Sequence, residues 1–461
     1  MQTIFITLPE TFIARNIFFT DFWKTFRDNY KGKIILLVKP EKLETYQALF
    51  QSPDTIVVAV NYRPLGYFRR LIDWMALNGI DTHTNTWEKM FAYTRSDASF
   101  ISTTLKIIYT KIFGNISFWK KFIRYLYLLQ PSPIELDVLF DTYKPTHVFA
   151  TSLTNREFDV WIAIVAKKRK IPLIGMPRSW DNFTSHGLIR MVPDELIVQN
   201  QYLSDMAFAI QKFGLPKEHI HIVGLPHYDI YKNYQSLIVP REIFLQKLGI
   251  DQNKKIITYG AMGDFLFPHE GAVAPVLNKL VVEKKIPDNI QFFFRAHPRF
   301  LSPLEAIKSL PHVTPDTVAL HVGKDQAGKE IDIHETAHLI NTIFHSDIII
   351  TGASTFAIDA IALGKPVICI DYDLNLSNIT YWQSAKRFYD TYTHFEALVE
   401  TGAVCVVKND PELAFAINRY VTNPLLDQEG RNAGLQLMVD PFDGKASLRL
   451  GNLLVSLTQH G

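Results

Sequence analysis

The chain has 461 residues, of which 47% are hydrophobic and 13% aromatic, and its formal net charge is +2. This length exceeds what one hydrophobic core supports, and we expect two domains. The small net charge argues against a polyanion-binding protein, so nucleic acid is not an expected partner. Only Cys369 and Cys405 occur, both in apolar runs, which favours a reducing cytoplasm over a disulfide framework.

The sequence shows neither a signal peptide nor a membrane-spanning segment. Residues 1–6 have no basic segment ahead of an apolar run, so we interpret them as a first strand and not as a signal peptide. No window of about eighteen residues is continuously apolar, so no spanning helix is expected. The sequence predicts a cytoplasmic protein, soluble or peripheral at the inner face of the membrane.

Short apolar runs alternate with longer helical patterns along the chain, which is typical of βαβ units and parallel sheets. A stretch rich in proline and polar residues at 225–240 indicates a linker. We therefore predict an N-terminal Rossmann-like domain at 1–235, a second at 236–440 and a terminal helix at 441–461. The predicted strands are 34–38, 55–60, 147–150, 173–175, 195–198, 220–223, 255–259, 291–294, 347–351, 367–371 and 403–407.

Two predicted strands of the second half end in polar clusters, Arg-Ala-His-Pro at 295–298 and Gly-Ala-Ser-Thr at 352–355. Open α/β sheets bind ligands at the carboxyl ends of their strands. His297 and Arg295 offer donors to a phosphate, and residues 352–355 open a helix whose free N–H groups favour an anion. We expect a phosphate site at two adjacent strand ends. The predicted donor-binding residues are Arg295, Pro298, Gly352, Ser354, Thr355 and Asp359, with Gly260 and Gly263 in second rank.

Each of these signals has a plainer interpretation. Serine and threonine are favoured at helix N-caps without any ligand, so Ser354 and Thr355 alone are ambiguous. The glycine-rich turn at 258–263 is nearly as well explained as a simple βα turn. The two polar clusters together favour the phosphate site over packing.

A second polar loop follows the predicted strand at 173–175. Trp180 offers a face for stacking a sugar, and Asp181 is a carboxylate that could take a proton from an acceptor hydroxyl. An Asx-turn in which Asp181 and Asn182 bond their own backbone is an equally good interpretation. The predicted acceptor-binding residues are Trp180, Asn182, Arg15 and Asn16.

The order of strand, Arg-Ala-His-Pro, strand, Thr-Gly-Ala-Ser-Thr, helix and strand resembles the donor half of GT-B glycosyltransferases. Within that fold it is most similar to the CDP-glycerol glycerophosphotransferases and to the bacterial capsule, sialic acid and Kdo transferases. Their His-Pro and Ser-Ser/Thr motifs hold a cytidine nucleotide. The loop at 179–182 resembles the Ser-Trp-Asp-Asn loop of the same broad group.

This resemblance implies two Rossmann-like domains whose parallel sheets face a cleft. It also implies metal-independent, inverting transfer of a glycosyl or polyol-phosphate group from a nucleotide-activated donor, CMP- or CDP-linked, to a surface polysaccharide or lipid-linked glycan. His297 and Arg295 would stabilise the leaving phosphate, and Asp181 would be the base. No cofactor is expected, and the terminal helix is expected to cross back to the N-terminal domain.

The segment 101–129 holds five lysine and arginine residues, many aromatic residues and no aspartate or glutamate. This composition suits an anionic membrane surface and a lipid-linked acceptor, with Lys120, Lys121 and Arg124 as headgroup contacts. A core helix with a solvated basic face explains the composition almost as well.

The sequence leaves three alternatives to a transferase. His334-Glu335-Thr336-Ala337-His338 matches a zinc pattern, but the further ligands of a zinc protease do not follow at the required spacing, and 371–373 resembles a metal-binding Asp-x-Asp. We expect no metal. UDP-N-acetylglucosamine 2-epimerases share the fold but usually carry paired glutamates where this chain has a lone Asp359. A noncatalytic lipid- or polysaccharide-binding protein is disfavoured by intact His297, Ser354 and Asp181.

Overall fold

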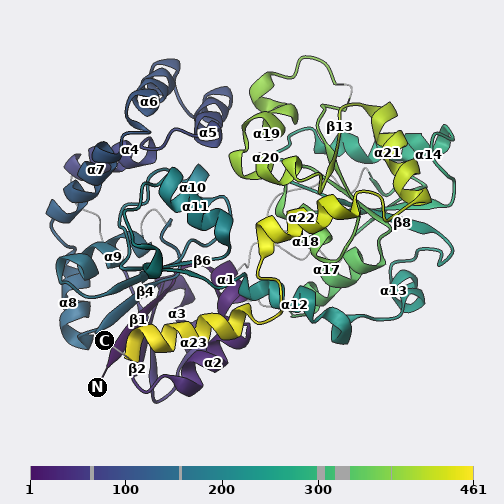
Figure 1. Cartoon of the computed structure of the whole chain (residues 1–461). Coiled ribbons are helices and arrows are strands. Elements are labelled where there is room, and N and C mark those ends of the chain that lie inside the picture. The colour runs from purple at the N-terminus through teal and green to yellow at the C-terminus, as the bar shows by residue number, and fades with distance from the viewer. Residues whose placement is uncertain are drawn as a thin grey trace. The chain divides into compact units, whose positions relative to one another are not determined.

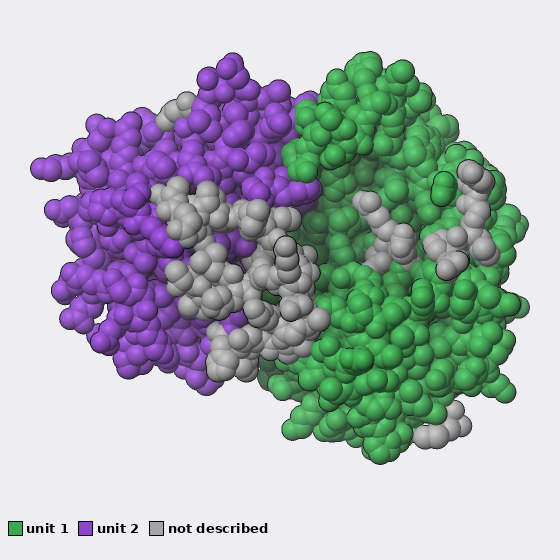
Figure 2. Space-filling model, turned by 180° about the vertical axis from the view of Figure 1, so that it is seen from behind, with its two compact units in different colours: residues 1–229, 439–461 green, residues 230–438 purple. Residues whose placement is uncertain are grey.

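The computed structural model describes residues 2–62, 67–154, 158–297, 307–316, 333–374 and 376–459. The chain divides into two compact units, coloured separately in Figure 2. Unit 1 contains Met1–Asp229 and Val439–Gly461, and unit 2 contains Ile230–Met438. Each unit is built on its own parallel sheet, so the predicted α/β class with two parallel-sheet domains is confirmed.

Unit 1 has a seven-stranded sheet in the order β3-β2-β1-β4-β5-β6-β7, and neighbouring strands of this sheet pair in parallel. Ile4 pairs with Ile34 on one side and with His147 on the other. The apolar runs become strands buried on both faces because helices cover the sheet. The strands are β1 (Thr3–Leu8), β2 (Lys33–Val38), β3 (Thr55–Ala59), β4 (His147–Ala150), β5 (Leu173–Gly175), β6 (Glu195–Val198) and β7 (Ile220–Ile222).

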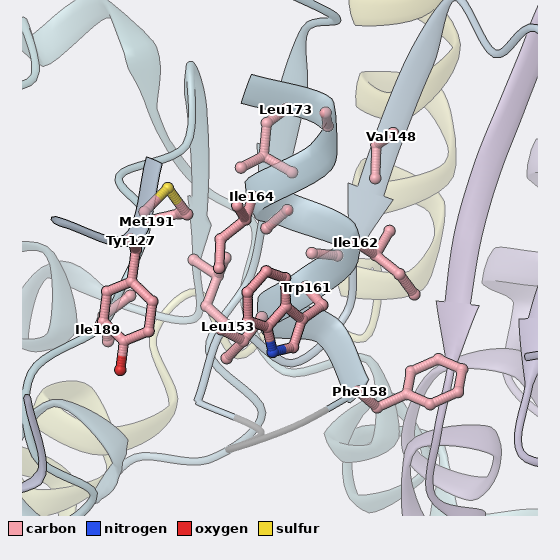
Figure 3. Close-up of a cluster of buried hydrophobic side chains, with 14 of the residues drawn as sticks. Tyr127, Val148, Leu153, Phe158, Trp161, Ile162, Ile164, Leu173, Ile189 and Met191 are labelled. Carbon is pink, nitrogen blue, oxygen red and sulfur yellow. The ribbon is translucent and has the colours of Figure 1, made fainter. Parts of the chain in front are cut away.

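Helix α9 (Phe158–Lys168) lies at the centre of the unit 1 core. Its residues Phe158 to Ala166 are all buried, and Figure 3 shows Trp161, Ile162 and Ile164 among side chains from the neighbouring strands. The helices of unit 1 are α1 (Thr11–Ile13), the π-helix η1 (Ala14–Phe18), α2 (Asp21–Asn29), α3 (Leu43–Phe50), α4 (Tyr67–Leu77), α5 (His83–Thr94), α6 (Phe100–Phe113), α7 (Ser117–Leu129), α8 (Ile134–Tyr143), α9 (Phe158–Lys168), α10 (Asn182–Ser185), α11 (Gln201–Ala209) and α23 (Ala446–Gln459). The short α12 (Asp229–Lys232) lies at the boundary.

The C-terminal helix α23 packs against α2, which lies near the start of the chain (Figure 1). A side chain at Gly451 would bring its Cβ within 2.9 Å of Thr25, so glycine allows this close approach. The helix begins where Ala446 and Ser447 donate their backbone N–H groups to the Asp229 carboxylate at 2.9 and 2.8 Å. A carboxylate at this end complements the helix dipole.

Unit 2 has a six-stranded parallel sheet in the order β10-β9-β8-β11-β12-β13. Its strands are β8 (Lys255–Gly260), β9 (Ile290–Arg295), β10 (Val313–Pro315), β11 (Ile348–Thr351), β12 (Val367–Ile370) and β13 (Cys405–Val407). Its helices are α13 (Arg241–Lys247), α14 (Val273–Val282), α17 (Ile333–His345), α18 (Thr355–Ala362), α19 (Lys386–Thr391), α20 (Thr393–Glu400), α21 (Asp410–Thr422) and α22 (Gln428–Val439). Within the described ranges, none of the helices is both long and apolar enough to cross a membrane.

Candidate functional site

The two polar clusters of unit 2 lie at one edge of its sheet. Gly260 at the end of β8 pairs with Arg295 on one side and with Thr351 on the other. The expectation that the clusters follow neighbouring strands was therefore wrong in one respect, because β8 lies between β9 and β11. All three strands run in the same direction, so their loops still emerge together.

The glycines after β8 and β11 allow these loops to pack. A Cβ at Gly260 would lie 2.2 Å from the ring of Phe356, and one at Gly352 would lie 2.0 Å from Met262 Sδ. Packing therefore accounts for glycine at both positions. A ligand contact by either residue stays a prediction.

Buried Glu270 organises the turn after β8. Its carboxylate accepts a hydrogen bond from the Tyr259 hydroxyl at 2.8 Å. It also accepts hydrogen bonds from the backbone N–H groups of Met262 and Gly263 at 2.5 and 2.8 Å. Burial raises the pKa of Glu270 to about 7. Because the Gly263 N–H is bonded to this carboxylate, the turn has no spare donor there for a phosphate. Sequence reasoning assigned Glu270 no role, since nothing in the local pattern marks it as a backbone acceptor.

The turn after β11 caps helix α18. Ser354 has extended backbone, and its hydroxyl accepts from Phe356 N at 3.2 Å, so the plain N-cap interpretation is realised. Thr355 is exposed at the first position of the helix, and Asp359 is half-buried one turn later. The N-terminus of α18 thus presents backbone N–H groups at the same edge as His297. Phosphate binding here stays a prediction.

Arg295 points into the protein. It is 6% exposed, and its guanidinium lies 2.8 Å from Asp316 Oδ2 and 3.7 Å from Glu335 Oε1. His338 Nε2 lies 3.0 Å from both Asp316 oxygens. The expected direct clamp on a phosphate is corrected accordingly, since this guanidinium is already paired with protein carboxylates. Arg295 instead fixes the end of β9, and half-buried His297 follows two residues later.

The zinc-like pattern at 334–338 is explained by the ion pairs around Arg295 and Asp316. Two of its members, Glu335 and His338, contact Arg295 and Asp316. Among the described residues, there is no group of three or more histidine, cysteine, aspartate or glutamate side chains that could hold a metal ion. Pro298 and the His334 side chain lie outside the described residues.

Asp371 at the end of β12 is a further candidate that the sequence suggested only as part of an Asp-x-Asp pattern. It is 7% exposed, and its Oδ1 has no hydrogen-bond partner among the described residues. Burial raises its pKa to about 7. Asp373, in contrast, accepts from Ser384 Oγ at 2.6 Å and from Ala385 N at 2.8 Å. Asp371 therefore adds a polar group at the same edge of the sheet.

In unit 1, Asn182 builds the loop that carries Asp181. Asn182 is fully buried, and its Oδ1 accepts from Thr154 Oγ1 and from the backbone N–H groups of Arg178 and Ser179, each at 3.0 Å. The expected contact of Asn182 with an acceptor is corrected, because a side chain with no exposed surface shapes the loop instead. Its Nδ2 donates to Asp181 Oδ1 at 3.1 Å.

Asp181 is only partly buried, with 26% of its side chain exposed. Its Oδ2 accepts from Ser185 Oγ at 2.9 Å and lies 3.8 Å from His186 Nε2. His186 in turn lies 3.3 Å from Arg178 Nη2. These contacts orient the carboxylate and place an imidazole beside it. Sequence reasoning missed His186, although it lies only five residues from Asp181. Trp180 is half-buried in the same loop.

Arg15 and Asn16 lie on the π-helix η1 after β1, and Arg15 Nε donates to Asn16 Oδ1 at 3.0 Å. Asn16 lines a small pocket of about 10 Å³, roughly the space of one water molecule. The pocket is formed by loops after β1, β5, β6 and β7, so Asn16 and Arg178 share the carboxyl edge of this sheet. Its lining residues are Phe12, Ile13, Asn16, Ile17, Met176, Pro177, Arg178, Gln199, Leu225, Pro226 and His227.

The basic segment 101–129 forms most of α6 and all of α7, and two of its predicted surface cations are buried. Lys120 is 1% exposed and donates to the Ile210 carbonyl. Arg124 is 7% exposed and donates to the carbonyls of Ile189 and Gln211 at 3.0 and 2.7 Å. Their assignment to a headgroup-binding surface was wrong, because these buried side chains donate to backbone carbonyl groups of a loop at Ile189 and of the end of α11. Lys121 is exposed.

A family model described as CDP-Glycerol:Poly(glycerophosphate) glycerophosphotransferase matches residues 187–456, which is more than half of the chain. A comparison with curated protein sequences gave no match.

Solved structures similar to the chain have the GT-B fold. The UDP-GlcNAc 2-epimerase from Neisseria meningitidis bound to UDP-GlcNAc has a TM-score of 0.55 and 15% identity, with 100% of both chains covered. The UDP-GlcNAc 2-epimerase from Methanocaldococcus jannaschii has a TM-score of 0.52 and 14% identity, covering 99% of this chain and 100% of that one. Arabidopsis thaliana UGT89C1 complexed with UDP has a TM-score of 0.50 and 11% identity, covering 99% and 100%. At such identities the likeness shows the fold alone, and the predicted GT-B fold is confirmed.

Proposed function

We propose a specific reaction for this chain, which belongs to the CDP-Glycerol:Poly(glycerophosphate) glycerophosphotransferase family and is a transferase that uses a nucleotide-activated donor. The reaction is metal-independent transfer of a glycosyl or polyol-phosphate group from a CMP- or CDP-linked donor to a surface polysaccharide or lipid-linked glycan. One observation carries the proposal. The loop with His297 and the N-terminus of α18 emerge at the same edge of one parallel sheet, inside the matched region.

The donor residues have separate tasks in this proposal. His297 donates to the leaving phosphate as negative charge develops there, and Ser354, Thr355 and the first N–H groups of α18 bind its other oxygens. Arg295 is a positioning residue, because its pairing with Asp316 holds the strand end that carries His297. No metal ion or cofactor takes part.

On the acceptor side, Asp181 accepts the proton of the attacking hydroxyl in an inverting displacement. Ser185 and Asn182 orient its carboxylate, and His186 Nε2 lies 3.8 Å from it, beyond direct hydrogen-bond distance. Trp180 stacks on a sugar ring, and Arg15 and Asn16 contribute polar contacts. The protein works in the cytoplasm, peripheral to the inner face of the membrane, where a lipid-linked acceptor is presented.

Replacing Asp181 with asparagine should slow transfer about 100-fold or more while donor binding stays nearly unchanged, since the amide keeps the shape but cannot take a proton. The measurement is turnover across pH together with calorimetry of nucleotide binding. Asp205→Asn, an exposed change in the same unit, is the matched control. Wild-type turnover in Asp181→Asn at every pH would place the base elsewhere, with His186→Ala as the next variant.

The donor nucleotide should be a cytidine nucleotide. The phosphate contacts of His297 and Ser354 do not distinguish bases, so the base must be read by other groups. Two of the similar structures hold UDP or UDP-GlcNAc, which makes UDP the rival. Calorimetric titration with CMP, CDP and UDP in EDTA decides between them. Tighter UDP binding by tenfold, about 1.4 kcal/mol, would overturn the cytidine assignment.

The alternative of an epimerase-like sugar-nucleotide enzyme is tested separately. Incubation with UDP-GlcNAc, followed by NMR of the product, would reveal inversion at carbon 2. Release of free nucleotide only in the presence of an acceptor supports transfer, whereas an isomerised nucleotide sugar without acceptor supports epimerisation.

A further inference from the structure

Helix α6 has its apolar face turned outward. Ile101, Leu105, Ile108 and Ile112 are 72%, 56%, 50% and 55% exposed. At about 100° per residue these four positions fall within an arc of about 60°, so they form one continuous stripe, which we call the α6 stripe. It is about 16 Å long at about 1.5 Å per residue.

The two buried residues of the same helix are threonines. Thr103 and Thr110, on the side opposite the stripe, are 3% and 1% exposed. Thr110 donates its hydroxyl proton to the Asn78 carbonyl at 3.0 Å, and α6 packs on α5. A surface helix normally buries its apolar side chains and exposes its polar ones. Tyr109 of α6 packs partly against the core of unit 1, but the four stripe side chains point away from it, so that core does not explain them.

Further apolar side chains are exposed near the ends of the stripe. Phe100 begins α6 and is 66% exposed. Ile116, between α6 and α7, and Phe118, in the first turn of α7, are 43% and 75% exposed. Figure 1 shows α5 and α6 at the end of unit 1 remote from α2 and α23. Clustered exposed apolar residues mark an interaction site more often than isolated ones.

We propose that the α6 stripe inserts into the interfacial layer of an anionic lipid membrane and holds the enzyme there. The proposal deepens the peripheral location given above and rests on the membrane presentation of the acceptor. An amphipathic helix lying in the interface buries such an apolar face among the upper acyl chains. The stripe, and not buried Lys120 and Arg124, supplies the main attraction.

Local charge favours this partner. The segment 101–129 has no acidic residue, and of its five basic residues Lys111 and Lys121 are exposed, whereas Lys120 and Arg124 are buried. Asp81, from the loop before α5, pairs with Lys111 at 2.8 Å and reduces the local positive charge only in part. Exposed cations beside an apolar face suit anionic headgroups.

A second copy of the chain fits the stripe less well. Stable protein interfaces usually involve roughly 20–30 residues on each side. The stripe and its three apolar neighbours offer far fewer, in a narrow row along one helix. A narrow apolar row is what a helix needs to lie in a membrane interface.

The test is flotation of the full-length protein with vesicles of phosphatidylcholine containing or lacking phosphatidylglycerol. The variant Leu105→Gln/Ile108→Gln/Ile112→Gln should reduce partitioning onto the anionic vesicles by about tenfold or more. The matched control, Val282→Gln/Phe415→Gln/Leu425→Gln, removes three similarly exposed apolar side chains from unit 2, at 60%, 65% and 71% exposure. It should bind vesicles like the wild type.

A second measurement reports the insertion itself. Ile108→Cys, labelled with an environment-sensitive dye, should shift its emission to the blue with anionic vesicles, whereas labelled Leu425→Cys should not. Equal flotation of the stripe variant and the wild type, or no shift at position 108, would overturn the proposal. So would a wild-type dimer in solution that the stripe variant converts to a monomer, since that outcome assigns the stripe to a second copy.

Nucleotide titration of the same variants separates this inference from the proposed reaction. The stripe lies in unit 1 and the donor residues lie in unit 2, so CMP or CDP binding should stay unchanged when vesicle binding is lost. Vesicle binding without any nucleotide binding by the wild type would contradict the proposed reaction and leave the membrane face standing.

Discussion

Replacing Arg295 with alanine is expected to destabilise unit 2 by about 3–5 kcal/mol, because it leaves the Asp316 carboxylate buried without its cation. Asp316 is fully buried and lies 2.8 Å from the Arg295 guanidinium. His338 also contacts Asp316, but an imidazole lacks the permanent charge and the several donors of a guanidinium. The measurement is urea unfolding followed by a probe in unit 2.

A double variant separates the buried charge from general packing loss. Arg295→Met/Asp316→Leu removes both charges and keeps apolar volume, and it should recover a large part of the stability lost in Arg295→Ala. Equal destabilisation by both changes would show that packing dominates. An Arg295→Ala protein as stable as the wild type would show that the pair of Arg295 and Asp316 does not stabilise the end of β9.

The pairing of Arg295 illustrates what the sequence could not provide. The strand 291–294 and its polar end were predicted correctly from a run of apolar residues followed by charged ones. The partners Asp316, Glu335 and His338 come from segments 21 to 43 residues away, and local pattern carries no information on such contacts. The motif therefore resembled a ligand clamp, whereas tertiary packing turned its guanidinium inward.

The headgroup-binding surface predicted for the segment 101–129 was wrong for a similar reason. A run without acidic residues suggests a solvated basic face, and no local pattern indicates that Lys120 and Arg124 contact carbonyl groups of residues 189, 210 and 211. Helical spacing alone would also have assigned the α6 stripe to the core. Its outward orientation is set by tertiary packing, which buries Thr103 and Thr110 on the opposite side of the helix.

The order of strands at the donor edge could also not be predicted from the sequence. Each polar cluster was placed correctly at the end of a parallel strand, because β-branched runs and the following turns are local features. Which strands neighbour one another depends on the crossover connections, and β8 enters between β9 and β11. The sequence therefore predicts which sheet edge carries the two polar clusters, but not how far apart the ends of β9 and β11 lie along that edge.

Replacing His297 with alanine is expected to lower turnover by about 2–4 kcal/mol in barrier height, roughly 30- to 1000-fold, with little change in stability. The loss falls on kcat because the imidazole donates to charge that grows as the leaving phosphate departs. His297 is half-buried at the open edge of the sheet, so removing its ring leaves the core of unit 2 intact.

The His297→Ala measurement combines turnover at saturating donor with calorimetry of the product nucleotide. His312→Ala, which removes another half-buried histidine from unit 2, controls for the loss of a ring alone. A large fall in kcat with nearly unchanged nucleotide affinity assigns His297 to the transition state, since uniform binding losses would raise KM instead. A folded His297→Ala enzyme with near wild-type turnover would remove His297 from the mechanism and leave the N-terminus of α18 as the principal phosphate contact.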